Sequence, residues 1–141
     1  MAVEQDHLDR ANLNLELAAD LLETFGQKYY DWTVTVLFYV AVHLIEAKLA
    51  CNDVHSGHHK ERKKSMQRDR VLNAVMREYN DLYNRSRDAR YGKNAPLPFK
   101  VFYKSDVRRS FRDVRSIADG LDYRGALSTL IMQRLRGASR T

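Results

Sequence analysis

The chain has 141 residues, with 44% hydrophobic and 30% charged side chains, which is the size and composition of one globular domain and excludes a disordered chain. Its net charge of +6 is unevenly distributed, because residues 1–53 hold three Lys/Arg against nine Asp/Glu and residues 54–141 hold twenty-one against nine. One cysteine excludes a disulfide scaffold, and the acidic N-terminus is unlike a secretory signal, so we expect a cytoplasmic protein.

The first third of the chain predicts two long helices. Apolar residues at spacings of three and four predict a helix over 4–25, which Gly26 ends. A second helix is predicted over 31–51, with Asp31 as its N-cap. This helix is apolar on most faces, Trp32 included, so we expect it at the centre of a bundle or in an oligomer interface.

The stretch from Trp32 to Cys51 is also about as long as a membrane span. It contains His43, Glu46 and Lys48, each of which is costly inside a bilayer. We therefore expect a buried helix of a soluble protein and no contact with a membrane.

Five polar residues fall on one face of the second predicted helix, at spacings of four, four, four and three: Asp31, Thr35, Tyr39, His43 and Glu46. Two interpretations are open. The stripe is either hydrogen-bonded within the core, with a neighbour satisfying His43, or it forms a polar seam at an interface or a pocket.

The basic part of the chain predicts further helices. Residues 52–64 read as a polar loop that enters a basic helix, and an apolar stripe over 71–83 predicts a third helix that continues to Tyr91 and ends at Gly92. A proline-containing connector over 93–104 precedes a fourth helix capped by Ser105. We expect an all-α, antiparallel four- to five-helix bundle over residues 1–121, with a short helix and a basic tail over 122–141.

The familiar catalytic signatures are missing from the sequence. It contains no glycine-rich phosphate loop, no GxSxG and no HExxH motif, so we expect neither a cofactor nor a metal. His55, His58 and His59 lie close together in the loop, which is only a weak zinc signal. A solvated loop and a role in acid–base chemistry are the other interpretations.

The arginines near the end of the third predicted helix give the stronger signal. Tyr83, Arg87 and Tyr91 are one helical turn apart, which predicts a guanidinium between two phenols. Arginine suits phosphate oxygens and tyrosine can stack on a base, although a cationic last turn also complements the helix dipole. The candidate anion-binding residues are Lys60, Arg62, Tyr83, Arg85, Arg87, Arg90 and Tyr91.

The order of these features resembles that of the HEPN superfamily (higher eukaryotes and prokaryotes nucleotide-binding). The resemblance covers about residues 8–121 and rests on three segments: Tyr30-Asp31-Trp32 opening an apolar helix that carries Tyr39 and His43, the loop HSGHHKER, and YNDLYNRSRDARYG over 79–92. It implies a helical bundle that commonly pairs as a homodimer. Many members of the superfamily are metal-independent endoribonucleases in toxin–antitoxin and antiviral defence systems.

The superfamily's catalytic pattern is an arginine and a histidine separated by four to six residues, near the end of the third helix. Arg85 and Arg87 stand in the place of the arginine, and Tyr91 stands where the histidine is expected. The resemblance therefore implies that Arg85 and Arg87 bind phosphate. If the protein cleaves RNA, the acid–base chemistry falls to His55, His58 or His59.

Two functions remain open. The first is an HEPN-like RNA-binding protein, either a metal-independent endoribonuclease of a toxin–antitoxin or antiviral defence system or a binder alone. The alternative is a non-catalytic nucleotide-binding or protein-interaction subunit of a defence assembly. The expected partners are RNA or a nucleotide, a second copy of the chain in a homodimer, and an antitoxin or another defence-complex partner. DNA binding ranks lower, because no helix-turn-helix spacing is evident.

Overall fold

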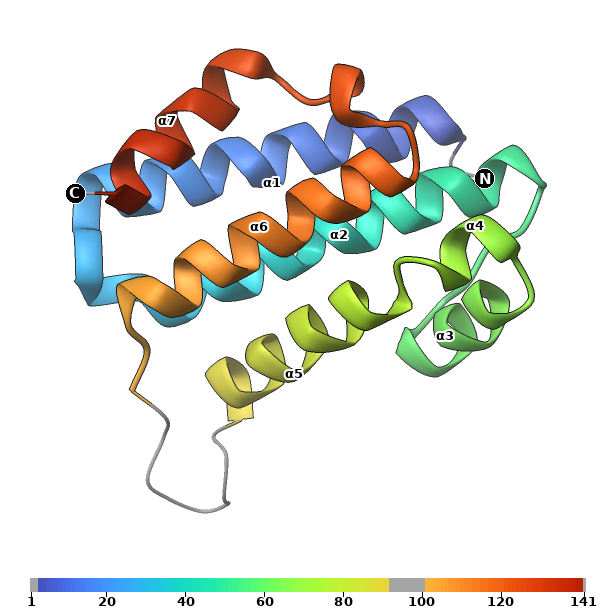
Figure 1. Cartoon of the computed structure of the whole chain (residues 1–141), viewed down its shortest axis with the longest axis horizontal. Helices are drawn as coiled ribbons and strands as arrows, with labels where there is room; N and C mark the ends of the chain where they lie inside the picture. The colour runs from blue at the N-terminus through green and yellow to red at the C-terminus, as the bar shows by residue number, and fades with distance from the viewer. Residues whose placement is uncertain (1–2, 92–100, 141) are drawn as a thin grey trace.

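The computed structural model describes residues 3–91 and 101–140, and in these ranges the chain forms seven α-helices, two short 3-10 turns and no strand (Figure 1). The predicted all-α bundle is confirmed. The five longest helices are α1 (Glu4–Phe25), α2 (Tyr30–Cys51), α5 (Met76–Tyr91), α6 (Lys104–Gly120) and α7 (Thr129–Arg140).

Helices α1 and α2 form an antiparallel hairpin, joined by a 3-10 turn over Gly26–Tyr29. Gly26 has a positive φ of 54°, which favours glycine, and the predicted end of the first helix is confirmed. The prediction that Asp31 caps the second helix is wrong, because Tyr29 precedes the helix and Asp31 lies within its first turn. There its carboxylate still interacts favourably with the helix dipole.

The segment 52–64 enters a helix at His59, since α3 covers His59–Gln67. The third predicted helix, with its apolar stripe over 71–83, is wrong in its continuity, because a turn at Ala74 and Val75 divides it into α4 (Arg70–Asn73) and α5. Asp69 starts α4, since its carboxylate accepts hydrogen bonds from the backbone N–H groups of Val71 (2.9 Å) and Leu72 (3.1 Å). The apolar spacing continues across the turn because the turn is short. Gly92, the predicted end of this helix, lies outside the described residues.

Helix α6 begins after Tyr103, whose backbone N–H donates to Asp106 Oδ2 at 2.9 Å. Ser105 is therefore inside the helix, and its prediction as the cap is wrong. Most of the predicted connector over 93–104 lies outside the described residues, since the structure resumes at Val101.

The C-terminal segment is helical as far as Arg140, so the prediction of a basic tail is wrong for the described residues. Its helix α7 packs against α1 (Figure 1). Asn12 on α1 holds the segment in place, because its side-chain amide donates to the carbonyl of Ala126 (2.9 Å) and its side-chain oxygen accepts from the N–H of Ser128 (2.8 Å). Leu127 and Leu135 belong to the same core as the rest of the bundle.

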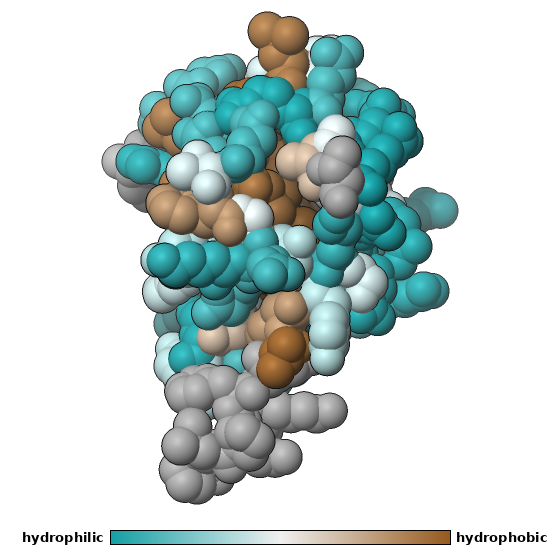
Figure 2. All heavy atoms as spheres, turned by 90° about the vertical axis from the view of Figure 1, so that its left-hand side faces the viewer, coloured by the Kyte–Doolittle hydropathy of each residue, from teal (hydrophilic) through white to brown (hydrophobic). Residues whose placement is uncertain are grey.

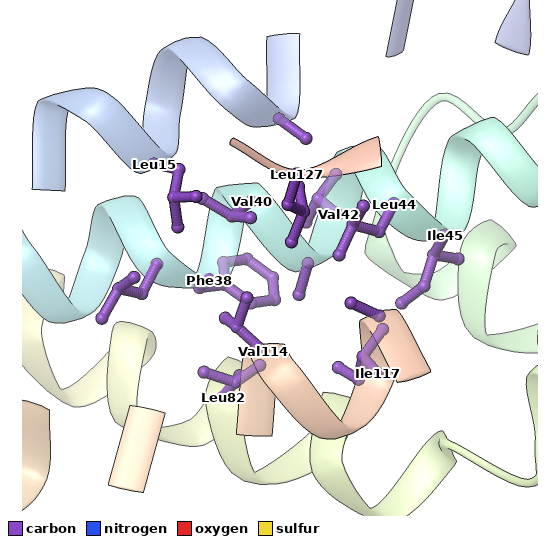
Figure 3. Close-up of a cluster of buried hydrophobic side chains, with 14 of the residues drawn as sticks. Leu15, Phe38, Val40, Val42, Leu44, Ile45, Leu82, Val114, Ile117 and Leu127 are labelled. Carbon is purple, nitrogen blue, oxygen red and sulfur yellow. The ribbon is translucent and has the colours of Figure 1, made fainter. Parts of the chain in front are cut away.

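Helix α2 lies at the centre of the fold, in contact with α1, α5 and α6. The core around it is built from all of these helices, as Figure 3 shows for Leu15 of α1, Phe38 of α2, Leu82 of α5 and Val114 of α6. A helical stretch within Glu4–Cys51 is long and apolar enough to cross a membrane, but 67% of its most apolar window is buried inside the protein.

The apolar character of α2 does not extend to its first turn. Trp32 is 55% exposed, so the expectation that it belongs to the buried part of this helix is wrong. It lies near the end of the molecule where α1 turns into α2, and there apolar patches alternate with hydrophilic side chains (Figure 2).

Candidate functional site: a pocket of aromatic and cationic side chains

A cavity of about 330 Å³ opens where α2, α5 and the start of α3 meet. We call it the aromatic pocket, since four of its lining residues are phenylalanine or tyrosine and four are histidine or arginine, of which His59 and Arg90 contact the rings. Its volume falls within the range of ordinary small-ligand sites. The lining residues are Phe38, Tyr39, Val42, Gly57, His58, His59, Arg62, Tyr83, Arg90 and Tyr91.

His59 is held rigidly in this pocket. Its ring stacks on Tyr83, with ring centroids 3.5 Å apart and an interplanar angle of 6°, and its Nδ1 lies 2.6 Å from the hydroxyl of Tyr79. The position follows from the start of α3, where the His58 side chain accepts a hydrogen bond from the backbone N–H of Glu61 and caps the helix one residue earlier. Burial lowers the pKa of His59, and the nearby cation of Arg62 lowers it further, so the ring is neutral near pH 7.

The hydrogen bonds of Tyr79 fix which nitrogen of His59 carries the proton. Tyr79 is fully buried, and its hydroxyl oxygen accepts from Arg62 Nη1 at 3.3 Å. A buried hydroxyl hydrogen needs an acceptor, and His59 Nδ1 is the acceptor within reach among the described residues. We therefore assign the N–H of the neutral imidazole to Nε2, which makes this nitrogen a hydrogen-bond donor.

Arg62 connects the pocket to the polar stripe of α2. Its Nε donates to Glu46 Oε1 at 2.7 Å, and both residues are buried, with exposed fractions of 8% and 5%. Ser56 donates its hydroxyl and its backbone N–H to the same carboxylate. The charge of Arg62 is thus compensated inside the protein, which makes Arg62 a structural support of the pocket.

Arg90 is the cation of the pocket that keeps its charge available. Its guanidinium donates to the hydroxyl of Tyr39 (3.3 Å) and to the carbonyl of Ser86 (3.3 Å), and it lies over the rings of Tyr39 (5.9 Å to the centroid) and Tyr91 (5.2 Å). No carboxylate of the described residues forms an ion pair with it. The guanidinium is therefore held in place by neutral groups, and its positive charge remains free to meet an anion.

Several residues that the sequence predicts to bind an anion lie outside the aromatic pocket. Arg85 donates to Ser110 (3.2 Å) and forms an ion pair with Asp113 (2.8 Å) on α6, and its side chain is only 14% exposed. Arg87 is exposed and has no ring contact in the described part of the chain, so the predicted guanidinium between two phenols is wrong and Arg90 takes that place. Lys60 is exposed and lies outside the lining.

The three clustered histidines separate in the structure. His55 lies 3.5 Å from Asp53, His58 caps α3, and only His58 and His59 line the aromatic pocket. Within residues 3–91 and 101–140, no three His, Cys, Asp or Glu side chains come together in a way that could hold a metal ion.

A larger groove of about 650 Å³ lies between α5 and α6, and it contains Arg85. Its lining is almost entirely charged, but acids and arginines alternate in it and partly neutralise one another, as in the pairs Arg85–Asp113 and Arg109–Asp106. Burial raises the pKa of Asp113 in spite of the adjacent Arg85. This groove offers neither an aromatic ring nor a net positive charge, so we consider the aromatic pocket the better candidate site. The lining residues of the groove between α5 and α6 are Arg77, Glu78, Asp81, Asn84, Arg85, Asp106, Arg109, Arg112, Asp113 and Ser116.

In the polar stripe of α2, some residues are hydrogen-bonded inside the protein and others line a pocket, so each of the two interpretations holds for part of it. His43 is satisfied by a neighbour, since its Nδ1 lies 3.1 Å from Nδ1 of His7 on α1, and Glu46 is bound by Arg62. Burial and the proximity of His7 lower the pKa of His43 to about 4. Tyr39, in contrast, lines the aromatic pocket, and a smaller cavity beside it is lined by Asp31 and Thr35, whose hydroxyl donates to the carbonyl of Asp31.

Two residues of this region were absent from the sequence-based candidates. The sequence places Tyr79 in an apolar stripe and at the start of the segment 79–92, and nothing in its spacing indicates that its hydroxyl joins His59 and Arg62. Trp32 is counted among the apolar residues of the second predicted helix, although it is three residues before Thr35 and seven before Tyr39 and so falls on the polar side of α2. That spacing is a signal that could have placed it at the surface.

Comparisons of the chain with family models, with curated proteins and with solved structures gave no match. The resemblance to the HEPN superfamily therefore stays a prediction from the sequence.

Proposed function

We propose that the protein binds RNA, with one nucleotide in the aromatic pocket. The observation that carries the proposal is the position of Arg90, a cation without an acidic partner among the described residues, held beside the rings of Tyr39 and Tyr91. A nucleotide has the matching chemistry, because its base can stack on an aromatic ring and its phosphate can accept from a guanidinium. The Nε2–H that we assign to His59 adds a second donor.

The charge of the surrounding chain supports the same ligand. Residues 54–141 carry twenty-one Lys/Arg against nine Asp/Glu, and this stretch supplies seven of the ten lining residues of the pocket. An excess of positive charge attracts a polyanion from a distance and makes its binding sensitive to salt.

Binding is a better proposal than cleavage for this arrangement. A metal-independent ribonuclease needs a base that takes the proton from the ribose 2′-hydroxyl, and a neutral His59 that already accepts from Tyr79 at Nδ1 presents a donor at Nε2. Arg85, the arginine that the HEPN pattern assigns to phosphate, is engaged by Asp113. We therefore propose an HEPN-like RNA-binding protein, in the homodimeric defence setting that the resemblance implies.

The experiment measures binding of a nucleoside monophosphate and of a short single-stranded RNA by calorimetry. Arg90→Gln is expected to weaken both affinities roughly 10- to 150-fold, the equivalent of losing a charge-assisted hydrogen bond of ~1.5–3 kcal/mol. The matched control is Arg112→Gln, which removes the same charge from the groove between α5 and α6. Equal losses in the two variants, or no loss in Arg90→Gln, would overturn the assignment to the aromatic pocket.

Two further measurements complete the test. RNA affinity is expected to fall steeply between low and high salt, and an affinity that stays flat would contradict the electrostatic part of the proposal. Incubation with labelled RNA in EDTA is expected to leave the RNA intact. Cleavage that disappears in His59→Asn and persists in His55→Asn would replace binding by ribonuclease activity.

A further inference from the structure

A second, smaller cavity shares Arg90 with the aromatic pocket. Its volume is about 110 Å³, and it is lined by Asp31, Trp32, Thr35, Ala89 and Arg90. We call this second cavity the tryptophan pocket.

We infer that a single strand of RNA crosses the surface over Arg90, with one base in the aromatic pocket, a second base on Trp32 in the tryptophan pocket, and the phosphate between them on Arg90. This inference rests on the proposed RNA binding and adds to it the number of bases, their places and the single-stranded form of the ligand.

The exposure of Trp32 supports the second base site. Trp32 is 55% exposed, although most apolar side chains of α2 are buried. The large exposed ring is an apolar surface beside a fixed cation, which is the combination that proteins use to stack the bases of single strands. The cavity is too small to enclose a whole base, so we expect a base to stack against the exposed ring and insert only an edge.

The spacing of the two sites favours a single strand. Trp32 and Tyr39 are seven residues apart on α2, which places them on one face and about 10 Å apart along the helix axis. Successive bases in a stacked strand are only about 3.4 Å apart. Bases that occupy both sites must therefore be separated from one another, which an unpaired strand allows and a duplex does not.

The charges of the tryptophan pocket indicate where the phosphate and the second base of the strand lie. Asp31 lines this cavity and repels a phosphate, but its carboxylate oxygens can accept hydrogen bonds from the N–H groups on the edge of a base. Arg90 is the cation shared by both cavities. The phosphate is thus expected at Arg90, and the polar edge of the second base at Asp31.

Trp32 is the only tryptophan of the chain, so tryptophan fluorescence reports on the second site alone. The full-length protein is titrated with a nucleoside monophosphate, a single-stranded RNA hexamer, the same hexamer as DNA, and an RNA duplex of equal length. We expect the RNA hexamer to quench the fluorescence, and we expect the monophosphate to bind by calorimetry without quenching. A duplex that quenches as strongly as the single strand would overturn the separated-base geometry, and a DNA hexamer that binds more tightly would overturn the choice of RNA.

Two variants separate this inference from the proposed function. Trp32→Ala is expected to weaken hexamer binding roughly 5- to 150-fold, the equivalent of ~1–3 kcal/mol for one stacked base, and to leave monophosphate binding unchanged. As a control, Phe25→Ala removes another partly exposed ring, 46% exposed, from the end of α1. It is expected to change neither hexamer binding nor monophosphate binding. If Trp32→Ala binds the hexamer like the unmodified protein while Arg90→Gln still loses it, only the second site is refuted. If Arg90→Gln also binds normally, both proposals fail.

Discussion

Replacing Glu46 with alanine is expected to destabilise the protein by about 3–5 kcal/mol, the usual cost of removing one partner from a buried ion pair. Glu46 and Arg62 are 5% and 8% exposed, and Arg62 Nε lies 2.7 Å from Glu46 Oε1. The variant therefore leaves the guanidinium buried, with the hydroxyl of Tyr79 as its one remaining partner among the described residues. Ser56 loses both of its contacts to the carboxylate. A domain of this size is stable by about 5–15 kcal/mol, so the loss is a large share of the total.

The measurement is urea-induced unfolding followed by far-ultraviolet circular dichroism. A double variant, Glu46→Leu with Arg62→Met, removes both charges and fills the space with apolar atoms, and it is expected to recover most of the lost stability. Recovery would show that the cost comes from the uncompensated charge rather than from a damaged core.

The matched control is the surface pair of Asp119 and Arg124, whose side chains are 49% and 60% exposed and 3.6 Å apart. Asp119→Ala is expected to cost less than about 1 kcal/mol, because water already screens both charges. A loss in Glu46→Ala no larger than this, or a double variant as unstable as the single one, would refute the reasoning from burial.

Three further predictions concern stability. The pKa of His43 is about 4 in the folded state and 6.5 ordinarily. The stability that the neutral ring contributes is therefore fully present above pH 6.5 and is lost as the pH falls towards 4. Since the ring is only half-buried, we expect urea unfolding to show a loss of about 1–3 kcal/mol between pH 7 and 4.5, and a smaller loss in His43→Asn. Gly120→Ala is expected to lower the free energy of unfolding by about 1–3 kcal/mol in thermal unfolding, because the new Cβ lies 2.6 Å from Val75 Cγ1. Gly137→Ala, whose new Cβ has nothing within 4 Å, is expected to raise it by up to about 1 kcal/mol. Equal effects of the two substitutions would contradict the close packing at Gly120. Tyr79→Phe is expected to cost about 1–3 kcal/mol and to shift the imidazole tautomer seen by NMR, and an unchanged tautomer would contradict the assigned donor.

The long helices could be predicted from the sequence because each depends on local signals. The apolar period of α1 and the glycine at its end place that helix over its observed range, and the length of α2 overrides its β-branched content. Cap residues were predicted less well. Asp31 and Ser105 each lie inside their helices, because backbone geometry selects the cap and the tyrosines Tyr29 and Tyr103 carry no sequence signal for it.

The candidate site could be predicted only in its residue types. Tyr83, Arg90 and Tyr91 on α5 are candidates because arginines and tyrosines gather at the end of the predicted helix, although the spacing selects Arg87 rather than Arg90. Helix α3 brings His59 and Arg62 to them, because the helix break at Asp69 folds it back on α5. No local pattern shows that break as a change of direction. The participation of α2 through Tyr39 and Trp32 depends in the same way on tertiary packing, which a single sequence does not display.

The contrast between two arginines of α5 shows what decides whether a cation is available. Arg85 and Arg90 are five residues apart, so they project from the helix about 140° from one another. Arg85 meets the carboxylate of Asp113 on α6, while Arg90 meets the phenol of Tyr39 on α2, which orients a guanidinium without neutralising it. The residue on the facing helix therefore determines the role of each arginine. The same reasoning explains why the candidate site lies on the α2 side of α5, although the groove on the α6 side is larger.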